Sequence, residues 1–262
     1  MLNKIIDIVK ECGEIILGAT DIARKIHQKE GKGNFVTDYD SRVQAALKEK
    51  LLALLPEAVF FGEEDDADRE DISNGYAFIV DPIDGTANFT RGYKMSCISA
   101  ALAKDGRPIL GVVYNPYLEE VFYAQKGGGA FLNQDRITAS SNTLEESIIL
   151  FGTSPYSEEL SKKSFEIAYR YFSRARDLRR SGSAAYDMCC LACGRADFFF
   201  ELGLSPWDYA AAALIVEEAG GIISDMEGNP VTYDKKQPVA GRAPKVELLC
   251  QDGLSGSNSS NI

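Results

Sequence analysis

The stretch Asp-Pro-Ile-Asp-Gly-Thr at residues 81–86 combines the residue types needed to bind both a hard cation and a phosphate. Asp81 and Asp84 supply two carboxylates, and the apolar run before them, residues 76–80, predicts a short buried strand that ends at Asp81. The glycine that follows permits a tight turn, and Thr86 adds a hydroxyl beside backbone N–H groups. Carboxylates favour Mg²⁺ or Ca²⁺, and clustered N–H groups favour phosphate. By themselves, Asp-Pro and Asp-Gly are as typical of a surface turn.

Three further acidic positions lie next to predicted elements. Glu63 belongs to an acidic run that directly follows a short apolar strand, so two strand ends that carry carboxylates can converge at one edge of a sheet. Asp40 is expected in the first turn of a helix over residues 43–55, and Asp208 in the first turn of a helix over residues 207–219. Each position is also explained without function, because helix dipoles stabilise first-turn carboxylates and acidic runs are typical of solvated loops.

Composition limits the classes of function. The chain has 262 residues, 45% of them hydrophobic, which is enough for a sizeable core in one large domain or two closely packed halves. Its formal net charge is −11 and its pI is about 4.7, whereas a general nucleic-acid binder needs a basic face. Nucleic acid is therefore not an expected partner. The basic run at residues 174–180 is interpreted as a solvated surface or an interface patch.

A single histidine, His27, restricts the metal chemistry. It excludes a zinc site built from several histidines, and we expect it on the surface at the end of the first helix. Six cysteines are scattered along the chain, and the Cys190–Cys193 pair has no second pair to complete a zinc site, so buried free thiols in a reducing compartment are expected. A metal must then be held mostly by oxygen, which indicates magnesium, manganese or calcium.

The N-terminus leads into an amphipathic pattern and not into the apolar block of a signal peptide. No apolar stretch reaches the length needed to span a membrane. We therefore expect a cytoplasmic protein with no membrane partner.

The predicted elements change in style near residue 140. Apolar residues at helical spacing predict a first helix over residues 2–27. Alternating or apolar runs after the central motif predict antiparallel strands, at residues 96–103, 109–114 and 120–124. After the loop at residues 140–143, strands alternate with helices, at residues 147–151, 157–172, 176–178, 184–193, 197–201, 207–219 and 222–224.

We therefore predict two halves and a tail. The N-terminal α+β half, residues 1–140, carries the antiparallel sheet and most of the candidate metal ligands. The C-terminal half, residues 141–251, is α/β in character. Residues 252–262, which are rich in Ser, Asn and Gly, are predicted to be a flexible tail.

Five separated pieces of the chain together resemble the inositol monophosphatase family, within the wider group of lithium-sensitive, magnesium-dependent sugar phosphatases. They are Asp40, residues 62–64, residues 81–86, residues 182–184, and Trp207-Asp208 with residues 217–221. The resemblance covers roughly residues 1–245. It implies a mixed α+β and α/β fold, a layered αβαβα sandwich of the inositol monophosphatase and fructose-1,6-bisphosphatase type.

The resemblance implies two or three Mg²⁺ ions. Glu63, Asp81 and the Ile83 carbonyl would hold the first ion. Asp81, Asp84 and Asp208 would hold the second, with Asp81 bridging, and a third, weaker ion would again use Glu63. A phosphate monoester resists hydrolysis so strongly that electrostatic stabilisation must supply most of the barrier reduction, and carboxylates provide it only when loaded with metal.

The remaining roles also come from the resemblance. The catalytic set would be Thr86 and Asp40, which orient and deprotonate the attacking water, together with Glu63. The substrate would be bound by the Gly85 and Thr86 amides at its phosphate and by the positions that face the polyol. The implied substrate-binding residues are Asp84, Gly85, Thr86, Gly182, Ser183, Ala184, Glu201 and Asp208. Lys29 matches a basic residue near the site.

The leading hypothesis is a phosphoric monoester hydrolase that acts on a small polyol phosphate, inositol monophosphate first. Fructose-1,6-bisphosphate, histidinol phosphate and a 3′-phosphoadenosine nucleotide are alternatives, and Asn88-Phe89 after the motif argues against the nucleotide. From a different class, the chain could be a regulatory partner in transcription complexes, for which residues 174–180 are the supporting feature. Relatives are commonly dimers, so a homodimer is expected.

Overall fold

The structure is a computed structural model that describes residues 1–22, 26–28, 35–65 and 71–249. Its helices are α1 (Leu2–Leu17), α2 (Asp38–Leu54), α3 (Thr86–Arg91), α4 (Glu158–Phe172), α5 (Ala184–Ala192) and α6 (Pro206–Glu218), with a 3₁₀ turn, η2 (Leu144–Glu146). Its strands are β1 (Ile26–Gln28), β2 (Phe35–Thr37), β3 (Val59–Gly62), β4 (Tyr76–Asp84), β5 (Cys97–Lys104), β6 (Arg107–Asn115), β7 (Glu120–Gln125), β8 (Gly129–Leu132), β9 (Asp135–Ile137), β10 (Ile148–Phe151), β11 (Asp177–Arg179), β12 (Phe198–Leu204), β13 (Ile222–Ser224) and β14 (Gln237–Arg242).

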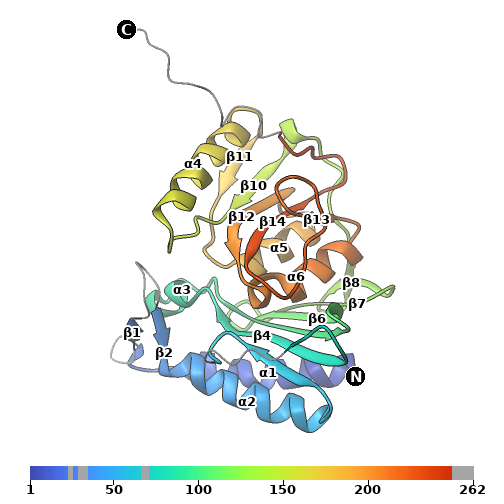
Figure 1. Cartoon of the computed structure of the whole chain (residues 1–262). Coiled ribbons are helices and arrows are strands. Elements are labelled where there is room, and N and C mark those ends of the chain that lie inside the picture. Colours follow the sequence, from blue (N-terminus) through green and yellow to red (C-terminus); the bar gives the residue numbers. More distant parts are fainter. Residues whose placement is uncertain (23–25, 29–34, 66–70, 250–262) are drawn as a thin grey trace.

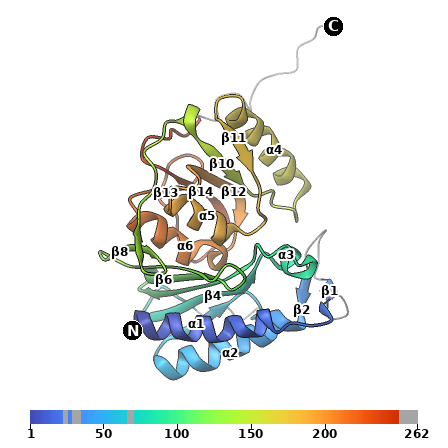
Figure 2. The same cartoon turned by 180° about the vertical axis from the view of Figure 1, so that it is seen from behind.

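Two mixed sheets are stacked with helices between and outside them (Figure 1). The larger sheet has the order β3-β4-β5-β6-β7-β8-β9, and the smaller sheet has the order β11-β10-β12-β14-β13. Helices α1 and α2 cover one face of the larger sheet, and α5 and α6 lie between the sheets (Figures 1 and 2). Helix α4 lies on the outer face of the smaller sheet. This arrangement confirms the αβαβα sandwich.

Each interface between layers has its own hydrophobic core. Helix α1 buries Ile5, Val9, Cys12 and Ile16, which recur at helical spacing, against the larger sheet. In contrast, α6 is apolar on all sides, as expected for a helix enclosed between two sheets. The third core lies between α4 and the smaller sheet.

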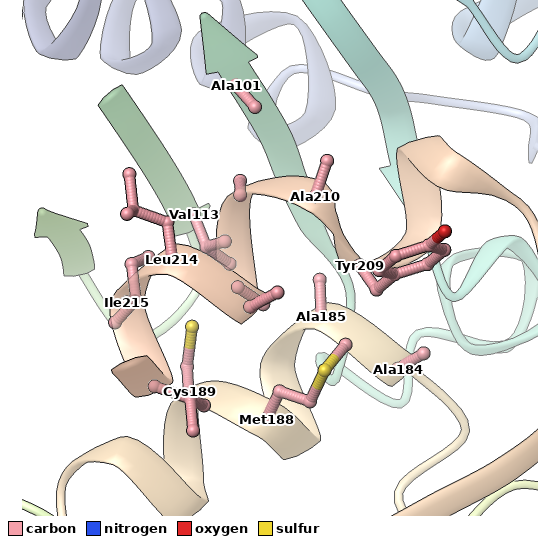
Figure 3. Close-up of a cluster of buried hydrophobic side chains, with 14 of the residues drawn as sticks. Ala101, Val113, Ala184, Ala185, Met188, Cys189, Tyr209, Ala210, Leu214 and Ile215 are labelled. Carbon is pink, nitrogen blue, oxygen red and sulfur yellow. The ribbon is translucent and has the colours of Figure 1, made fainter. Parts of the chain in front are cut away.

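Small side chains allow α5 and α6 to approach each other and the larger sheet closely. Figure 3 shows Ala185 of α5 directed towards α6, and Ala210 on the opposite side of α6, directed towards the strand that carries Ala101. At Gly111 on β6, a Cβ atom would lie 2.6 Å from the Ala211 carbonyl oxygen, so a larger residue would push α6 off the sheet. The position of α6 matters because its first turn carries Asp208.

The prediction of one helix over residues 2–27 is wrong. Helix α1 ends at Leu17, and Ile26–Gln28 forms β1, antiparallel to β2, so His27 lies in a strand and not at a helix end. The cause is a contact across the chain. The Tyr39 hydroxyl accepts a hydrogen bond from the Thr20 amide at 2.9 Å and donates one to the Thr20 carbonyl at 2.8 Å, which holds this segment outside a helix.

Most of the other predicted elements are confirmed within a few residues. Strands β5, β6 and β7 pair antiparallel, and β10 pairs parallel with both β11 and β12. The short helix α3 and the strands β9 and β14 were not predicted. The division into halves at residue 140 stays a prediction, and the predicted tail lies outside the described residues.

Candidate active site

Strands β3 and β4 are parallel neighbours, and they bring two acidic segments together at the same end of the larger sheet. Gly62 is paired with Val80, and the Glu63 amide donates to the Val80 carbonyl oxygen at 3.1 Å. Glu63 therefore leaves its strand beside Asp81. The predicted convergence of two carboxylate-bearing strand ends is confirmed.

A β-bulge sets the directions of Asp81 and Asp84. Strand β4 does not end at Asp81, as the sequence predicted, but continues to Asp84, because β5 pairs with it along that whole length. Asp81 lies opposite Ser99, and Asp84 lies opposite Cys97. Ser99 and Cys97 are two positions apart and share a face of β5. Their partners on β4 are three positions apart, so β4 contains one extra residue between them. Both carboxylates consequently lie on the same face of the sheet. Pro82 is tolerated because a bulge does not need its missing N–H.

Asp84 is fixed by the start of a helix about a hundred residues further along the chain. Its carboxylate accepts hydrogen bonds from the Ser183 hydroxyl at 2.6 Å, the Ala185 amide at 2.7 Å and the Ala184 amide at 3.3 Å. These are the N–H groups that lack intrahelical partners in the first turn of α5. Asp84 thus caps α5 and joins the larger sheet to the helix layer behind it.

Asp208 is held by its own helix terminus. It is the third residue of α6 and forms a capping box with Ser205, whose amide donates to the Asp208 carboxylate at 2.7 Å. The helix end is in turn placed by Trp207, which packs on Phe61 of β3 with ring centroids 5.6 Å apart. Asp208 is thereby brought close to Glu63, which follows β3.

Asp40 and Thr86 form a hydroxyl–carboxylate pair from two distant segments. One Asp40 oxygen accepts hydrogen bonds from the Thr37 amide at 2.8 Å and the Thr37 hydroxyl at 2.6 Å, which completes the capping box of α2. The other Asp40 oxygen lies 3.2 Å from the Thr86 hydroxyl, which is also 3.1 Å from the Ile83 carbonyl oxygen. This capping box holds Asp40 against Thr86.

Gly85 makes the turn between β4 and α3 in the left-handed region, with φ of 85°. A Cβ atom there would lie 2.8 Å from the Met95 carbonyl oxygen and 3.2 Å from Ser183 Cβ, so only glycine fits. The Asn88 side chain donates to the carbonyl oxygens of Met95 at 2.6 Å and Ser181 at 2.9 Å, which holds α3 beside the loop before α5.

These segments enclose one cavity of about 340 Å³. Every predicted site residue lines this cavity except two. Asp40 lies behind Thr86, and Lys29 lies outside the described residues. The predicted residues that line it are Glu63, Asp81, Ile83, Asp84, Gly85, Thr86, Gly182, Ser183, Ala184, Glu201 and Asp208. The roles assigned to them stay predictions, but the tertiary structure brings the residues together.

The cavity has one strongly acidic wall, which we call the acidic cluster: Glu63, Asp81, Asp84 and Asp208. Burial raises the pKa of Asp81 well above its usual range, and the charges of Glu63, Asp84 and Asp208 raise it further. Burial likewise raises the pKa of Asp84 and Asp208. Repelling carboxylates in a buried place require a cation or protons.

Glu201, on β12, lies apart from this cluster in the same cavity. Its carboxylate accepts a hydrogen bond from the Ser154 amide at 2.8 Å. A Cβ atom at Gly152 would overlap it, so the glycine makes room for the carboxylate. Burial raises the pKa of Glu201 to about 7.

Comparison with known proteins agrees with this geometry. The Inositol monophosphatase family matches residues 1–252. The chain belongs to the inositol monophosphatase family. The chain is 35% identical to an inositol monophosphatase of Dictyostelium discoideum, over 95% of this chain and 93% of that protein. It is 34% identical to Nus factor SuhB of Vibrio cholerae, over 99% of this chain and 97% of that protein.

Among solved structures, an IMPase from Thermotoga maritima superposes with a TM-score of 0.80 at 32% identity, and the match covers 90% of this chain and 89% of that one. Family membership and fold are therefore established by sequence and by structure. Phosphate-ester hydrolysis is the chemistry of the relatives named as phosphatases, whereas the SuhB relatives are named for a different role.

The acidic cluster fits the hard, oxygen-bound cation that this family of phosphatases suggests. Its donors are carboxylate oxygens with the Ile83 carbonyl beside them, the set that suits Mg²⁺. In the described residues, no three acidic, cysteine or histidine side chains are already spaced to enclose one ion. Backbone amides hold Asp81 through Ile83 and Asp208 through Ser205, and both carboxylates line the cavity.

Several cavity residues were not predicted from sequence. They lie in different parts of the fold: Tyr156 in a loop, Asp187 in a buried part of α5, and Arg180 and Lys236 in two exposed loops. Only Arg180 lay in a segment with a visible signal, the basic run at residues 174–180. That run was interpreted as surface or interface, and Arg180 is exposed but also lines the cavity.

Of the described cysteines, Cys12, Cys97 and Cys189 are buried and Cys190 and Cys193 are intermediate, and all five are free. In the described residues, no helix has the length and apolar character to cross a membrane.

Proposed function

We propose that this chain is a Mg²⁺-dependent phosphatase that hydrolyses a small polyol phosphate monoester, with inositol monophosphate as the first substrate to test. The observation that carries the proposal is the acidic cluster, which shares a cavity with the Gly85–Thr86 turn and the Asp40–Thr86 pair. A buried group of carboxylates repels phosphate by itself, and it binds phosphate only through cations. Membership of the family supports the same chemistry.

Glu63, Asp81 and the Ile83 carbonyl oxygen would hold one Mg²⁺, and Asp81, Asp84 and Asp208 a second, with Asp81 shared. When bound, such ions lower the pKa of a nucleophilic water and stabilise the negative charge on the leaving oxygen. The protein holds the ligands in advance, because Asp84 and Asp208 are each anchored at a helix start. Such anchoring limits the reorganisation needed when metal and substrate enter.

The Asp40–Thr86 pair would serve the attacking water. The Thr86 hydroxyl lies 3.2 Å from Asp40, so it can pass a proton to that carboxylate while its own oxygen accepts one from the water. Burial raises the pKa of Asp40, which makes its carboxylate a stronger proton acceptor. Asp40 cannot turn away, because Thr37 holds its other oxygen through two hydrogen bonds. Glu63 would share the orientation of the water.

The substrate would lie across the cavity between two kinds of group. The amides of Gly85 and Thr86, at the start of α3, would donate to the phosphate oxygens. The Glu201 carboxylate would accept hydrogen bonds from polyol hydroxyls, and the backbone around Gly182, Ser183 and Ala184 would border the ring. A carboxylate that accepts two hydroxyl hydrogen bonds favours a substrate rich in hydroxyl groups.

The finer assignments belong to the same proposal. Fructose-1,6-bisphosphate, histidinol phosphate and a 3′-phosphoadenosine nucleotide are the alternative substrates. We also propose lithium sensitivity at the second metal position, a homodimer, a cytoplasmic location, and two halves that meet at residue 140.

A second candidate function is a regulatory role in transcription complexes. The supporting observations are relatives that are named Nus factor SuhB and the exposed arginines of residues 174–179, among which Arg174 pairs with Glu145 at 3.3 Å. The two functions need not exclude each other, because these arginines are exposed in the segment from the end of α4 through β11, and the acidic cluster lines the cavity. Recovery of a polymerase or ribosomal factor with the tagged chain, lost when Arg174 and Arg176 become alanine, would support this role.

The deciding experiment is a phosphate-release panel across inositol-1-phosphate, fructose-1,6-bisphosphate, histidinol phosphate and 3′-phosphoadenosine-5′-phosphate. We expect release with Mg²⁺, no release with EDTA, and recovery when Mg²⁺ is restored. Zn²⁺ should substitute poorly, because the described residues that line the cavity include no histidine or cysteine. Full activity in metal-free protein, or no release from any substrate with Mg²⁺, would overturn the proposal.

A further inference from the structure

Two basic side chains line the same cavity as the acidic cluster. Arg180 precedes the Gly182 turn and Lys236 precedes β14, and both are exposed at the mouth of the cavity. Both lie close enough to Glu201 to stabilise its charge, because each lowers the pKa that burial raises. We call Arg180 and Lys236 the basic rim. It stands out in a chain that has 39 acidic and 28 basic residues and a net charge of −11.

Neighbouring side chains hold the two cations of the basic rim in place, and no ion pair among the described residues neutralises them. Arg180 donates to the Thr153 hydroxyl at 3.2 Å, and the Lys236 ammonium lies 5.7 Å above the centre of the Tyr156 ring. Within the part of the chain that the structure describes, neither cation has a carboxylate oxygen within 4.0 Å. By contrast, the neighbouring Arg179 pairs with Asp177 at 2.5 Å. The two cations that face the cavity therefore remain available to an anion.

We infer that Arg180 and Lys236 bind a second phosphate group of the substrate, so that the preferred substrate is a polyol bisphosphate. This inference rests on the proposed function, since the first phosphate is the one that is hydrolysed. With that phosphate at the Gly85–Thr86 turn and the hydroxyls at Glu201, a polyol monophosphate would leave the basic rim facing water. A second phosphate on the Glu201 side of the polyol would meet it.

The two residue types suit that task in different ways. The arginine guanidinium matches two phosphate oxygens in a planar, bidentate arrangement, whereas the lysine ammonium acts as a compact point charge. The basic rim could instead serve only to keep Glu201 ionised. That alternative predicts equal damage to monophosphate and bisphosphate hydrolysis when the rim is removed, because both substrates would depend on Glu201 alike.

The test compares two matched pairs of substrates, fructose-1-phosphate with fructose-1,6-bisphosphate and inositol-1-phosphate with inositol-1,4-bisphosphate, each with Mg²⁺. The variants are Arg180→Ala, Arg180→Lys and Lys236→Ala. The controls are Arg179→Ala and Lys235→Ala, which remove the same charges at the adjacent positions that do not line the cavity. The readout is kcat and KM for release of the phosphate common to each pair.

For the wild-type chain we expect a lower KM for the bisphosphates. Arg180→Ala should raise KM for a bisphosphate by about 10- to 100-fold, the range expected for a hydrogen bond to a charged group, with kcat nearly unchanged. The loss on the monophosphates should be much smaller, about threefold, since only long-range attraction is removed. Lys236→Ala should show the same selectivity, Arg180→Lys should recover part of the loss, and the two controls should match wild type.

Equal kcat/KM for both members of each pair would overturn the bisphosphate inference while leaving the proposed function intact. Equal losses on both members in Arg180→Ala would assign the rim to Glu201 instead. A loss of the same size in Arg179→Ala would show a general surface charge effect and would also overturn the inference. If no substrate of either pair is hydrolysed, the proposed function fails, and the inference fails with it.

Discussion

The acidic cluster and the basic rim line one cavity, yet the fold treats them differently. Asp81 and Asp84 are buried, lie on a paired strand and accept hydrogen bonds from backbone amides. Arg180 and Lys236 are exposed, lie on loops and are held by a single hydroxyl and an aromatic ring. Rigid secondary elements suit groups whose geometry the chemistry requires, and loops suit groups that select a substrate. The comparison therefore predicts that turnover depends on the first region and substrate preference on the second.

The largest effect is expected from Asp81→Asn. Asp81 would bridge two metals, so its loss should lower turnover by more than about 10³-fold, as for the removal of major electrostatic stabilisation. In EDTA the same variant should be more stable than wild type, because it relieves buried repulsion from Glu63, Asp84 and Asp208. The melting temperature should rise by about 2–4 °C for each kcal/mol of repulsion relieved.

Phosphate release and thermal unfolding with and without Mg²⁺ measure both effects of Asp81→Asn. Asp135→Asn, at an exposed position on β9, is the control and should change neither. A variant that lost activity and was also less stable in EDTA would contradict the account of the acidic cluster as a strained, cation-requiring site.

The next largest effect concerns Thr86→Ala. This change removes the hydroxyl beside Asp40 and leaves every proposed metal ligand in place. General-base positioning contributes about 10²–10⁴-fold, so turnover should fall within that range while Mg²⁺ affinity and KM stay close to wild type. Steady-state kinetics and Mg²⁺ titration by calorimetry provide the measurement. Thr86→Ser keeps the hydroxyl and should retain most of the activity; wild-type turnover in Thr86→Ala would refute the role of the pair.

A smaller effect is expected where the larger sheet is joined to α5 through Asp84. Ser183→Ala removes a buried hydroxyl that donates to Asp84 at 2.6 Å, while the Ala184 and Ala185 amides remain. We expect a loss of about 1–3 kcal/mol in the free energy of unfolding, the cost of a hydrogen bond to a charged group. Chemical denaturation measures it. Ser173→Ala, which removes an exposed hydroxyl bonded to a carbonyl oxygen at 2.8 Å, should cost much less.

The smallest effect is a pH dependence at the substrate side of the cavity. Burial raises the folded pKa of Glu201 and of Asp187 to about 7, so the folded state binds these protons more tightly than the unfolded state. The stabilisation of the folded state by these two protons is fully present below the unfolded pKa values of the two groups. It is lost as pH rises through about 7. In metal-free protein, the free energy of unfolding should therefore fall between about pH 5 and pH 7.

Glu201→Gln removes one of the carboxyl groups whose pKa burial raises, and it should reduce that slope without abolishing it. Denaturation curves at a series of pH values in EDTA measure the slope for both proteins. An unchanged slope in Glu201→Gln would show that the Glu201 carboxyl does not titrate in this range.

The sequence predicted the elements and the acidic side chains because both depend on local patterns. Apolar runs and helical spacing located β4, β5, α4 and α6, and Asp40 lies in the first turn of α2 as expected. Strand ends with carboxylates predicted that Glu63 and Asp81 converge, and parallel pairing of β3 with β4 confirms it.

Only the tertiary structure decided the features that depend on residues far apart in the chain. Pairing with β5 extends β4 through Asp81 and places the bulge that turns Asp84 to the same face. Tyr39 binds the Thr20 backbone just beyond the end of α1 at Leu17, and Asp84 caps α5 from across the molecule. The basic rim is of the same kind, because nothing local in the pair Lys235-Lys236 indicates that Lys236 lines the cavity and Lys235 does not. A hydrogen bond or a charge contact depends on the distance between two groups in space. For residues far apart in the sequence, that distance is set only when the chain folds.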